Sequence, residues 1–332
     1  MLKVIEAQEL DKRAWADLVK ASPVATWFQT HEAYGFFESL SFMEAFAFGV
    51  LSEGVLKGVV VGYIQRDGGR LKQFFSRRAI VLGGPLLSED IADEELGALL
   101  SAMKTKLKRK AIYIETRNFN DYSRWRKVFE QCGFDYEAHL NFHVAAESVE
   151  QAQGNIGKHR WRAIRISLRD GAQIVEAPTW RQVEMFYALL DDLYKTKVKT
   201  PLFPLEFFRK LYDTEGARYF LVEFEGEIVG GSLCVCLKDK TVYEWAKCGL
   251  DNYKKNIRPS SVATWEGIRY AAENGYTRYD FMGAGKPGEA YGVRDFKAEF
   301  GGELVEHGRF VQVCHPLLYG LGKCVVKILK KL

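Results

Sequence analysis

The sequence predicts an α/β or α+β protein of two domains, because strand and helix patterns alternate along all 332 residues. That length suffices for two domains of ordinary size. Hydrophobic residues make up 47% of the chain and charged residues 27%, which is the balance of a folded globular protein. Two blocks of the chain also repeat the order strands, helix, strand. We therefore expect a duplicated unit in which each sheet is flanked by helices.

The first block begins with apolar and small residues that suit a sheet. We expect, in order, two strands in 46–69 around a turn at 52–54, a helix in 88–108 capped by Ser88 or Asp90, a strand at 111–117, a helix at 122–133 ended by Gly133, and a closing strand at 134–144. An apolar stripe along the first of these helices indicates that it packs on the sheet.

The second block follows a small, polar and turn-prone segment at 145–158, where we place the domain boundary. The expected elements are three strands in 218–250 with turns at 225–226 and 238–240, a helix at 259–275 with Ser260 or Ser261 as N-cap and Gly275 after its end, and a strand at 276–283. Cys234 and Cys236 alternate within an apolar strand pattern, which suits reduced thiols in a core.

Charge is nearly balanced, because 47 Lys and Arg face 43 Asp and Glu, so affinity for polyanions must come from local clusters. One cluster consists of Lys158, Arg162, Arg165 and Arg169, which share one face of a predicted helix with no acidic residue before Asp170. Arginine suits bidentate contacts with phosphate. The segment is therefore either a phosphate grip or a charged surface helix.

The C-terminal segment 316–332 predicts a basic amphipathic helix. Its cations are Lys323, Lys327, Lys330 and Lys331, and its opposite face carries Leu317, Leu321, Val325, Ile328 and Leu332. Such a helix can lie on an anionic membrane surface or dock its apolar face on the protein.

The sequence does not indicate a nucleophile-and-base pair or a metal site. G-x-S-x-G and H-E-x-x-H are absent, and His139 and His143 lack further ligands nearby in the sequence. The glycine-rich stretch 279–303 lacks the G-x-x-x-x-G-K-[ST] pattern, and Pro287 interrupts any helix that could meet a pyrophosphate. A secretory signal and a run of 18 apolar residues are also missing, so we predict a cytoplasmic protein.

Three ordered segments resemble the FemABX family, the aminoacyl-transferring enzymes that extend the peptide of peptidoglycan precursors. Residues 158–176 are similar to the family's basic K-x-R-x-x-I-R segment, and residues 258–283 look like its P-x-x-x-x-W…[YF]-D-[FL]-x-G run. Residues 291–303 resemble its [YF]-G-[VI]-x-x-F-K-x-x-F-G-[GA] signature.

The resemblance implies two tandem GNAT-like domains, that is, domains with an N-acetyltransferase-like fold. The first consists of 1–150 with a returning segment 310–332, and the second, 151–309, carries the F-K signature. The implied donor is an aminoacyl-tRNA, the implied acceptor a nucleotide- or lipid-linked peptidoglycan precursor, and no cofactor is implied. The chain lacks the Q/R-x-x-G-x-G/A loop by which acetyl-CoA enzymes hold pyrophosphate, which favours tRNA over CoA as donor.

Acyl transfer to an amine needs an amine held near an activated carbonyl and a positive group where the oxyanion develops. The resemblance assigns these roles to the F-K pair: Lys297 stabilises the tetrahedral intermediate and Phe296 shapes the site. The residues expected to bind substrate are Tyr243, Arg258, Asp280, Tyr291 and Arg294, and those expected to meet a pyrophosphate or tRNA backbone are Lys158, Arg162 and Arg165. Asp280 can instead cap the turn at Gly283, and Lys297 can be an ordinary exposed lysine.

Two other functions remain open at this stage. The first is an N-acyltransferase that takes its acyl group from CoA or an acyl carrier on the same fold. The second is a non-catalytic protein that binds tRNA or a membrane surface, with contact to the inner membrane through 316–332. The amino acid transferred and the oligomeric state are not predicted.

Overall fold

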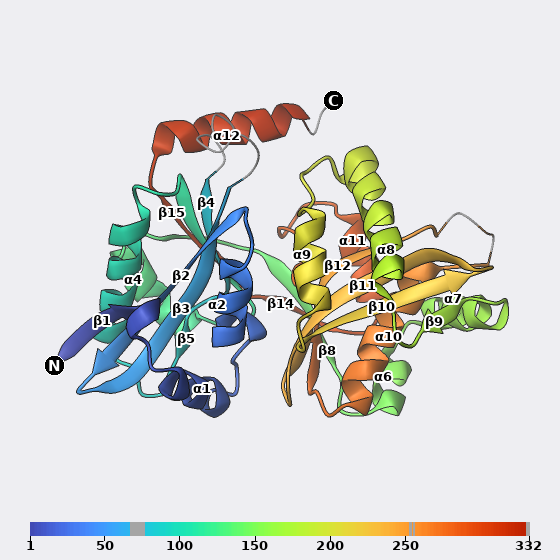
Figure 1. Ribbon diagram of the computed structural model, residues 1–332, viewed down its shortest axis with the longest axis horizontal. Helices are drawn as coiled ribbons and strands as arrows, with labels where there is room; N and C mark the ends of the chain where they lie inside the picture. The colour runs from blue at the N-terminus through green and yellow to red at the C-terminus, as the bar shows by residue number, and fades with distance from the viewer. Residues whose placement is uncertain (67–76, 252–253, 255, 330–332) are drawn as a thin grey trace. The chain divides into compact units, whose positions relative to one another are not determined.

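The computed structural model describes residues 1–66, 77–251, 254 and 256–329, with backbone only for 324–329. The chain forms two compact units (Figure 1). Unit 1 consists of Met1–His139 and Glu306–Leu332, and unit 2 consists of Leu140–Val305.

Unit 1 is built on a mixed sheet with the strand order β1-β2-β3-β4-β6-β15-β7, and β5 also pairs with β3. Its strands are β1 (Leu2–Glu6), β2 (Met43–Ser52), β3 (Val55–Gln65), β4 (Arg78–Gly83), β5 (Leu86–Leu87), β6 (Tyr113–Asn118), β7 (Asp135–Glu137) and β15 (Arg309–Val313). Its α-helices are α1 (Lys12–Ala21), α2 (His31–Glu38), α4 (Asp93–Leu107), α5 (Arg126–Gln131) and α12 (Pro316–Leu329).

Unit 2 contains a second mixed sheet with the order β14-β8-β13-β12-β11-β10-β9. Its strands are β8 (Leu140–Ala145), β9 (Gln173–Val175), β10 (Ala217–Phe224), β11 (Glu227–Leu237), β12 (Thr241–Gly249), β13 (Arg278–Asp280) and β14 (Glu303–Glu306). Its α-helices are α6 (Val149–Asn155), α7 (Lys158–Arg169), α8 (Trp180–Leu193), α9 (Leu205–Tyr212), α10 (Pro259–Glu273) and α11 (Gly292–Ala298).

The two sheets share one topology, as the duplicated sequence pattern predicts. Each contains a parallel pair, β4 with β6 in unit 1 and β12 with β13 in unit 2, and a long helix connects the two strands of each pair. Beside the second strand of each pair lies a strand from a distant part of the chain. This strand is β15 in unit 1 and β8 in unit 2.

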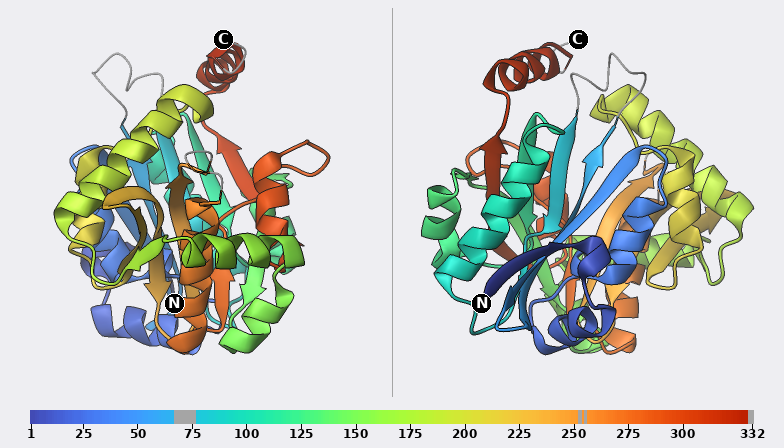
Figure 2. Two further views of the ribbon diagram at one scale, coloured as in Figure 1. Left: turned by 90° about the vertical axis from the view of Figure 1, so that its right-hand side faces the viewer. Right: turned by 60° about the vertical axis from the view of Figure 1, so that its left-hand side comes forward.

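The connecting helices pack on their sheets (Figure 2), and α4 buries the apolar stripe that the sequence predicts. In α4, Leu96, Leu99, Leu100 and Met103 have no exposed surface and join the core over β2 and β3. In α10, Ala263, Ile268 and neighbouring residues pack on β10, β11 and β12 in the core of unit 2. Cys234 and Cys236 are buried free thiols, as predicted.

Two predicted helix caps are wrong. Helix α4 has Ala92 as its N-cap, and the Glu95 side chain accepts a hydrogen bond from the Ala92 amide, so neither Ser88 nor Asp90 caps it. Helix α10 starts with Pro259 at its first position, because the fixed φ of proline suits a helix start. Ser260 and Ser261 therefore lie inside that helix, and Arg258 is the N-cap.

The expected closing strand at 134–144 is two strands that belong to different sheets. Strand β7 pairs with β15 in unit 1, whereas β8 pairs with β13 in unit 2. The units accordingly divide at His139 and again at Val305, earlier than the expected boundaries at 150 and 309. Part of the segment expected to be a linker forms α6, in which Ala152 is buried.

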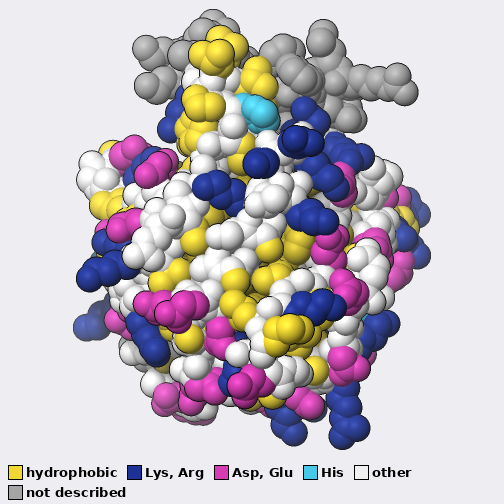
Figure 3. All heavy atoms as spheres, turned by 90° about the vertical axis from the view of Figure 1, so that its left-hand side faces the viewer, with side chains coloured by type: hydrophobic (Ala, Val, Ile, Leu, Met, Phe, Trp, Pro, Cys, Tyr) yellow, Lys and Arg dark blue, Asp and Glu magenta, His cyan; other side chains and the backbone are white. Residues whose placement is uncertain are grey.

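Helix α12 leaves large apolar side chains exposed. The exposed fraction is 85% for Leu317 and 59% for Leu321, and hydrophobic side chains gather on this helix in Figure 3. Tyr319 on the same helix packs against Tyr113 of β6, with 5.2 Å between ring centroids. The side chains of the predicted basic face beyond Lys323 lie outside the described residues.

Candidate functional site

The glycine-rich stretch forms a loop from Phe281 to Tyr291 between β13 and α11. Met282 takes a positive φ of 56°, and the Oδ1 atom of Asp280 accepts a hydrogen bond from its amide at 2.6 Å. The Asn141 side chain of β8 accepts from the Gly283 amide at 2.7 Å and donates to Asp280 Oδ1 at 2.7 Å. Asp280 and Asn141 together hold the sharp turn at the end of β13.

Lys297 lies on α11 with its ammonium group inside unit 2, and only 8% of the residue is exposed. Its Nζ atom donates to the carbonyl oxygens of Phe281 at 2.8 Å and Gly283 at 2.6 Å. The loop therefore fixes this amine. Burial, together with repulsion from the nearby Lys247, lowers the pKa of Lys297 to about 8, although Glu244 and Asp280 oppose the shift.

A β-bulge places a second lysine and a glutamate in this cluster. On β12, Glu244 pairs with Cys234 and Ala246 pairs with Leu233, so Trp245 is the extra residue. Glu244 and Lys247 consequently face α10 together. Thr264 Oγ1 donates to Glu244 at 2.9 Å, and Lys247 Nζ lies 3.2 Å from Thr264 Oγ1.

Glu244 is the carboxylate of this buried cluster. Its Oε2 atom accepts from the Tyr279 hydroxyl at 2.8 Å, and its Oε1 atom lies 3.3 Å from Lys247 Nζ. Burial lowers the pKa of Lys247, although Glu244 opposes that shift. Two largely buried lysines thus lie near one glutamate, and Asp280 and Asp251 add negative charge, since Asp280 raises the pKa of Lys297 and Asp251 that of Lys247.

Phe296 separates Lys247 from a third cation. The Phe296 ring centroid is 3.8 Å from Lys247 Nζ and 4.5 Å from the guanidinium carbon of Arg160. Arg160 belongs to α7 and also donates to Ser261 Oγ at 2.6 Å and to Glu299 at 3.1 Å. The aromatic ring therefore contacts cations through π interactions and shapes the cluster next to Lys297.

The five residues expected to bind substrate differ in their surroundings. Tyr243 and Asp280 have no exposed surface, and burial raises the pKa of Tyr243 to about 12. Arg258 donates to the carbonyl oxygen of Asp251 at 2.6 Å, and Arg294 donates to that of Ala284 at 2.8 Å, so both arginines bind backbone.

Tyr291 is the member of this set that presents most of its surface. It is the N-cap of α11, and 43% of it is exposed. Its ring lies beside Gly285, where a Cβ atom would come within 2.9 Å of it. The ring of Tyr291 is thus accessible to a molecule that approaches the loop from solvent.

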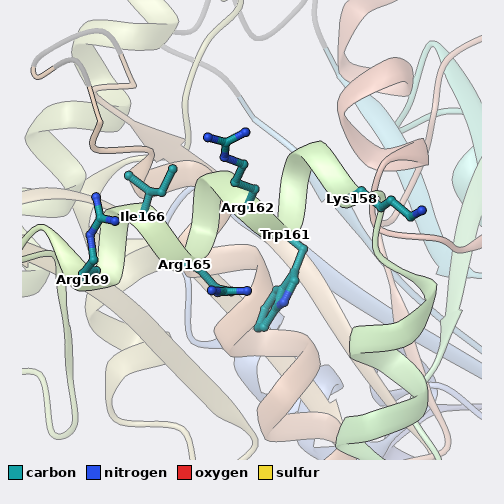
Figure 4. Close-up of a pocket in the computed structure, with 6 residues that line it drawn as sticks. All are labelled: Lys158, Trp161, Arg162, Arg165, Ile166 and Arg169. Atoms are coloured by element: carbon teal, nitrogen blue, oxygen red, sulfur yellow. The ribbon is translucent and has the colours of Figure 1, made fainter.

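The predicted phosphate-binding residues line a surface hollow of about 620 Å³ along α7 (Figure 4). Its described lining consists of Lys158, Trp161, Arg162, Arg165, Ile166 and Arg169. Arg169 pairs with Asp170 at 2.8 Å, whereas Lys158, Arg162 and Arg165 have no carboxylate partner within the described parts of the chain. Arg160 faces the opposite way, so α7 has cations on two sides.

A carboxylate occupies the N-terminus of α10. Asp251 Oδ1 accepts a hydrogen bond from the Ser260 amide at 3.1 Å. A helix N-terminus can otherwise bind an anion through its free amides and dipole. Asp251 therefore repels a pyrophosphate from this position.

Sequence reasoning missed Glu244, Lys247 and Arg160. Strict alternation along β12 would put Glu244 and Lys247 on opposite faces of the sheet, and only the bulge reverses that. Among the residues that the structure describes, no group of three metal-ligating side chains comes together. The cluster offers two ammonium groups, an aromatic ring and the Glu244 carboxylate.

Residues 158–298 match the family model described as an acetyltransferase (GNAT) domain. No curated protein matches the sequence of the chain. The fold is similar to the crystal structure of FemX, with a TM-score of 0.72 and 16% identity over 96% of this chain and 99% of FemX.

Two further structures have similar folds. A tandem GNAT protein from the clavulanic acid biosynthesis pathway gives a TM-score of 0.60 at 10% identity, over 95% of this chain and 99% of that one. The structure of L-PGS from Bacillus licheniformis gives 0.56 at 14% identity, over 97% of each chain. The predicted fold of two tandem GNAT-like domains is thereby confirmed.

Proposed function

We infer that this protein is an aminoacyltransferase, because its fold is similar to that of FemX and residues 158–298 match a GNAT acetyltransferase domain. We propose that it transfers an aminoacyl group from aminoacyl-tRNA to an amine of a peptidoglycan precursor peptide. Lys297 is the catalytic cation, and Phe296 shapes the pocket around it. No cofactor takes part, because the donor is already an activated ester.

One observation carries this proposal. An ammonium group has three N–H donors, and Lys297 gives two of them to the carbonyl oxygens of Phe281 and Gly283. The third has no acceptor among the residues that the structure describes. A fixed, buried donor of this kind suits an oxyanion that develops during acyl transfer, because low polarity strengthens the interaction and the donor needs no reorganisation.

The reaction requires little else from the protein. The acceptor amine attacks the ester carbonyl, the carbonyl oxygen becomes an oxyanion held by Lys297, and the tRNA hydroxyl leaves as the amide forms. The amine proton passes to the leaving oxygen or to water. A pKa of about 8 leaves Lys297 mostly protonated at neutral pH, which is the form that stabilises negative charge.

The choice of tRNA as donor rests on two features. Lys158, Arg162 and Arg165 are exposed cations without carboxylate partners in the described residues, as a phosphate backbone requires. Asp251 occupies the N-terminus of α10, where a pyrophosphate would otherwise be stabilised. The position of Asp251 favours a nucleic-acid donor over CoA, while the exposed cations suit the phosphates of either donor.

A CoA- or carrier-dependent N-acyltransferase is the second candidate, because the family model that matches residues 158–298 is described as an acetyltransferase domain. The two candidates share the site and the role of Lys297. They differ in the donor that fills the hollow along α7.

Contact with a membrane surface belongs to the proposal as well. Leu317 and Leu321 are exposed on α12, and an acceptor on a lipid carrier would lie at such a surface. No helix among the described residues is long and apolar enough to cross a bilayer.

The test is mass spectrometry of precursor peptides incubated with the protein and either charged tRNA or acetyl-CoA. We expect a mass increase of one aminoacyl group with charged tRNA. Lys297→Met should lower the rate by about 100- to 1000-fold. Lys210→Met, a change of an exposed lysine on α9, is the matched control and should retain the rate.

Transfer from acetyl-CoA but not from charged tRNA would show that CoA carries the donor group. The assignment of the protein as an acyltransferase would then still hold. Equal rates for Lys297→Met and Lys210→Met would remove Lys297 from the mechanism.

A further inference from the structure

The unit 1 sheet carries a cluster of charged side chains on the face opposite α4. Ala79, Val81, Ile114 and Phe310 point into the core with α4 and α5. Because side chains alternate along a strand, Arg78, Glu115, Arg117 and Arg309 project from the other face of β4, β6 and β15. Arg309 pairs directly with Arg117 in the register of β15 and β6. We call this set the arginine face.

Two guanidinium groups of the arginine face share one carboxylate. Arg117 donates to both oxygens of Glu115 at 3.3 Å, and Arg309 Nη1 donates to Glu115 Oε1 at 2.5 Å. Although burial opposes ionisation, Arg117 and Arg309 hold the pKa of Glu115 at about 2. The Glu115 side chain is 7% exposed, whereas those of Arg117 and Arg309 are 34% and 26% exposed. Solvent therefore reaches the arginines and not the carboxylate.

Positive charge is in excess around this face. Besides the three arginines, Lys323 of α12 lies near this face: a hydrogen bond with Tyr319 raises its pKa most, and Glu137 and Tyr113 raise it further. Glu137 pairs with Arg309 in the register of β7 and β15. Asp135, which pairs with Val311 of β15, projects from the same face as Glu137, so four cations accompany three carboxylates. Tyr113 adds a phenol that hydrogen-bonds with Arg78.

The second arginine on Glu115 is not needed to neutralise it. One bidentate arginine satisfies a carboxylate, and bringing a further guanidinium close costs desolvation and repulsion. Burial and Arg117 both lower the pKa of Arg309, which is the sign of that cost. Arg309 Nη2 contacts His139 Nε2 at 2.9 Å, and its buried Nε atom has no acceptor within the described chain.

We propose that the arginine face of unit 1 is a binding site for a phosphate group, with Arg117 and Arg309 as its principal ligands. The excess of positive charge suits an anion, and guanidinium forks suit the oxygens of a phosphate. Arginine also stays charged when partly buried, so the site needs no change of protonation to bind. The inference concerns unit 1 alone and does not depend on the transfer reaction proposed for unit 2.

The test is a calorimetric titration of the full chain with inorganic phosphate at constant ionic strength. We expect binding that weakens about tenfold or more in Arg117→Met and in Arg309→Met, since each removes a charged hydrogen bond. Arg126→Met, which changes an arginine of the same unit that stacks on Tyr136, is the matched control. Arg162→Ser on α7 checks that the signal does not come from unit 2.

Glu115→Gln separates ligand binding from a structural role. Removing the competing carboxylate frees both arginines, so this variant should bind phosphate more tightly than the natural chain, even where folding stability falls. Unchanged or weaker binding in Glu115→Gln, or equal binding in the two methionine variants and Arg126→Met, would overturn the proposal.

Calorimetric titrations with glycerol phosphate and with a nucleoside diphosphate show which class of molecule carries the phosphate that binds. Tighter binding of glycerol phosphate than of inorganic phosphate supports a lipid headgroup, and tighter binding of the diphosphate supports a nucleotide. The absence of binding for all three contradicts the site.

Discussion

The two units share a sheet topology and hold their buried cations in different ways. Unit 2 buries two lysines, Lys247 and Lys297, around one glutamate, and burial lowers both pKa values. Unit 1 sets two arginines on Glu115, and the carboxylate stays ionised with a pKa of about 2. Lysine can release its proton when buried, whereas arginine does not. The same fold therefore offers a titratable cation in one unit and a permanent charge in the other.

The difference teaches what a GNAT-like sheet can be used for. A lysine amine near neutral pKa, fixed by two carbonyl oxygens, suits a reaction in which negative charge appears and disappears. Two guanidinium groups that always stay charged suit the binding of an anion. The predictions below compare the two units further, beginning with the largest expected effect.

Substitutions at Gly301 in unit 2 and Gly308 in unit 1 test how rigid the backbone contacts of each unit are. Both have a positive φ, 76° and 63°. A Cβ atom on Gly301 would lie 2.0 Å from the carbonyl oxygen of Asn155, which is backbone, whereas one on Gly308 would meet the ring of Tyr136, which can move. We expect Gly301→Ala to lower the free energy of unfolding by about 4 kcal/mol and Gly308→Ala by less, measured by urea denaturation. Equal losses would show that the Asn155 contact is not rigid.

The stability of the protein should depend on pH through Lys297. In the unfolded chain this lysine keeps its proton up to its ordinary pKa near 10.5, but in the folded chain it loses it near 8. Between these values the unfolded state binds more protons, so this group makes stability rise with pH. The shift corresponds to an effect on the order of 3 kcal/mol.

Denaturation of Lys297→Met across the same pH range isolates this contribution. The difference in unfolding free energy between the natural chain and the variant should grow in favour of the natural chain from about pH 8 upward. Arg117→Met in unit 1 is the contrasting variant, because an arginine does not titrate there. A constant difference for Lys297→Met would mean that the lysine is not desolvated.

The exposed arginines of α7 should change tRNA affinity without changing stability. Arg162→Ser and Arg165→Ser each remove one predicted phosphate contact, so the slope of log affinity against log salt should fall by about 0.7 to 0.9 per variant. Arg169→Ser is the control, since Arg169 already pairs with Asp170. Filter binding at several salt concentrations measures the slope. An identical slope in all three variants would assign this helix face to ordinary surface charge.

Much of the architecture follows from sequence patterns, because apolar periodicity and turn residues act locally. The turns at 225–226 and 238–240 form as expected, with positive φ at Glu225, Gly226 and Asp239, and the stripe of α4 is buried as predicted. The division of residues 134–144 into β7 and β8 is not determined by the local sequence. It depends on which sheet each strand joins, and a single apolar run carries no such information.

The candidate site was predictable only in part. The F-K signature predicts roles for Phe296 and Lys297, but the pKa of Lys297 depends on its burial and on Glu244 and Lys247, which face it because of the bulge at Trp245. Arg258 and Arg294 have the residue type expected of substrate ligands, yet their described partners include backbone carbonyl oxygens. The sequence shows residue types, while burial and partners come from the packing.

The most direct test is an NMR titration of Lys297 in protein labelled with ¹³C-lysine, with the signal assigned by its loss in Lys297→Arg. We predict a pKa of about 8 for the natural chain. Lys247→Met should raise it, because Lys247 contributes repulsion. A pKa close to the ordinary 10.5, unchanged in Lys247→Met, would contradict the claim that unit 2 holds a buried, titratable lysine at its reaction centre.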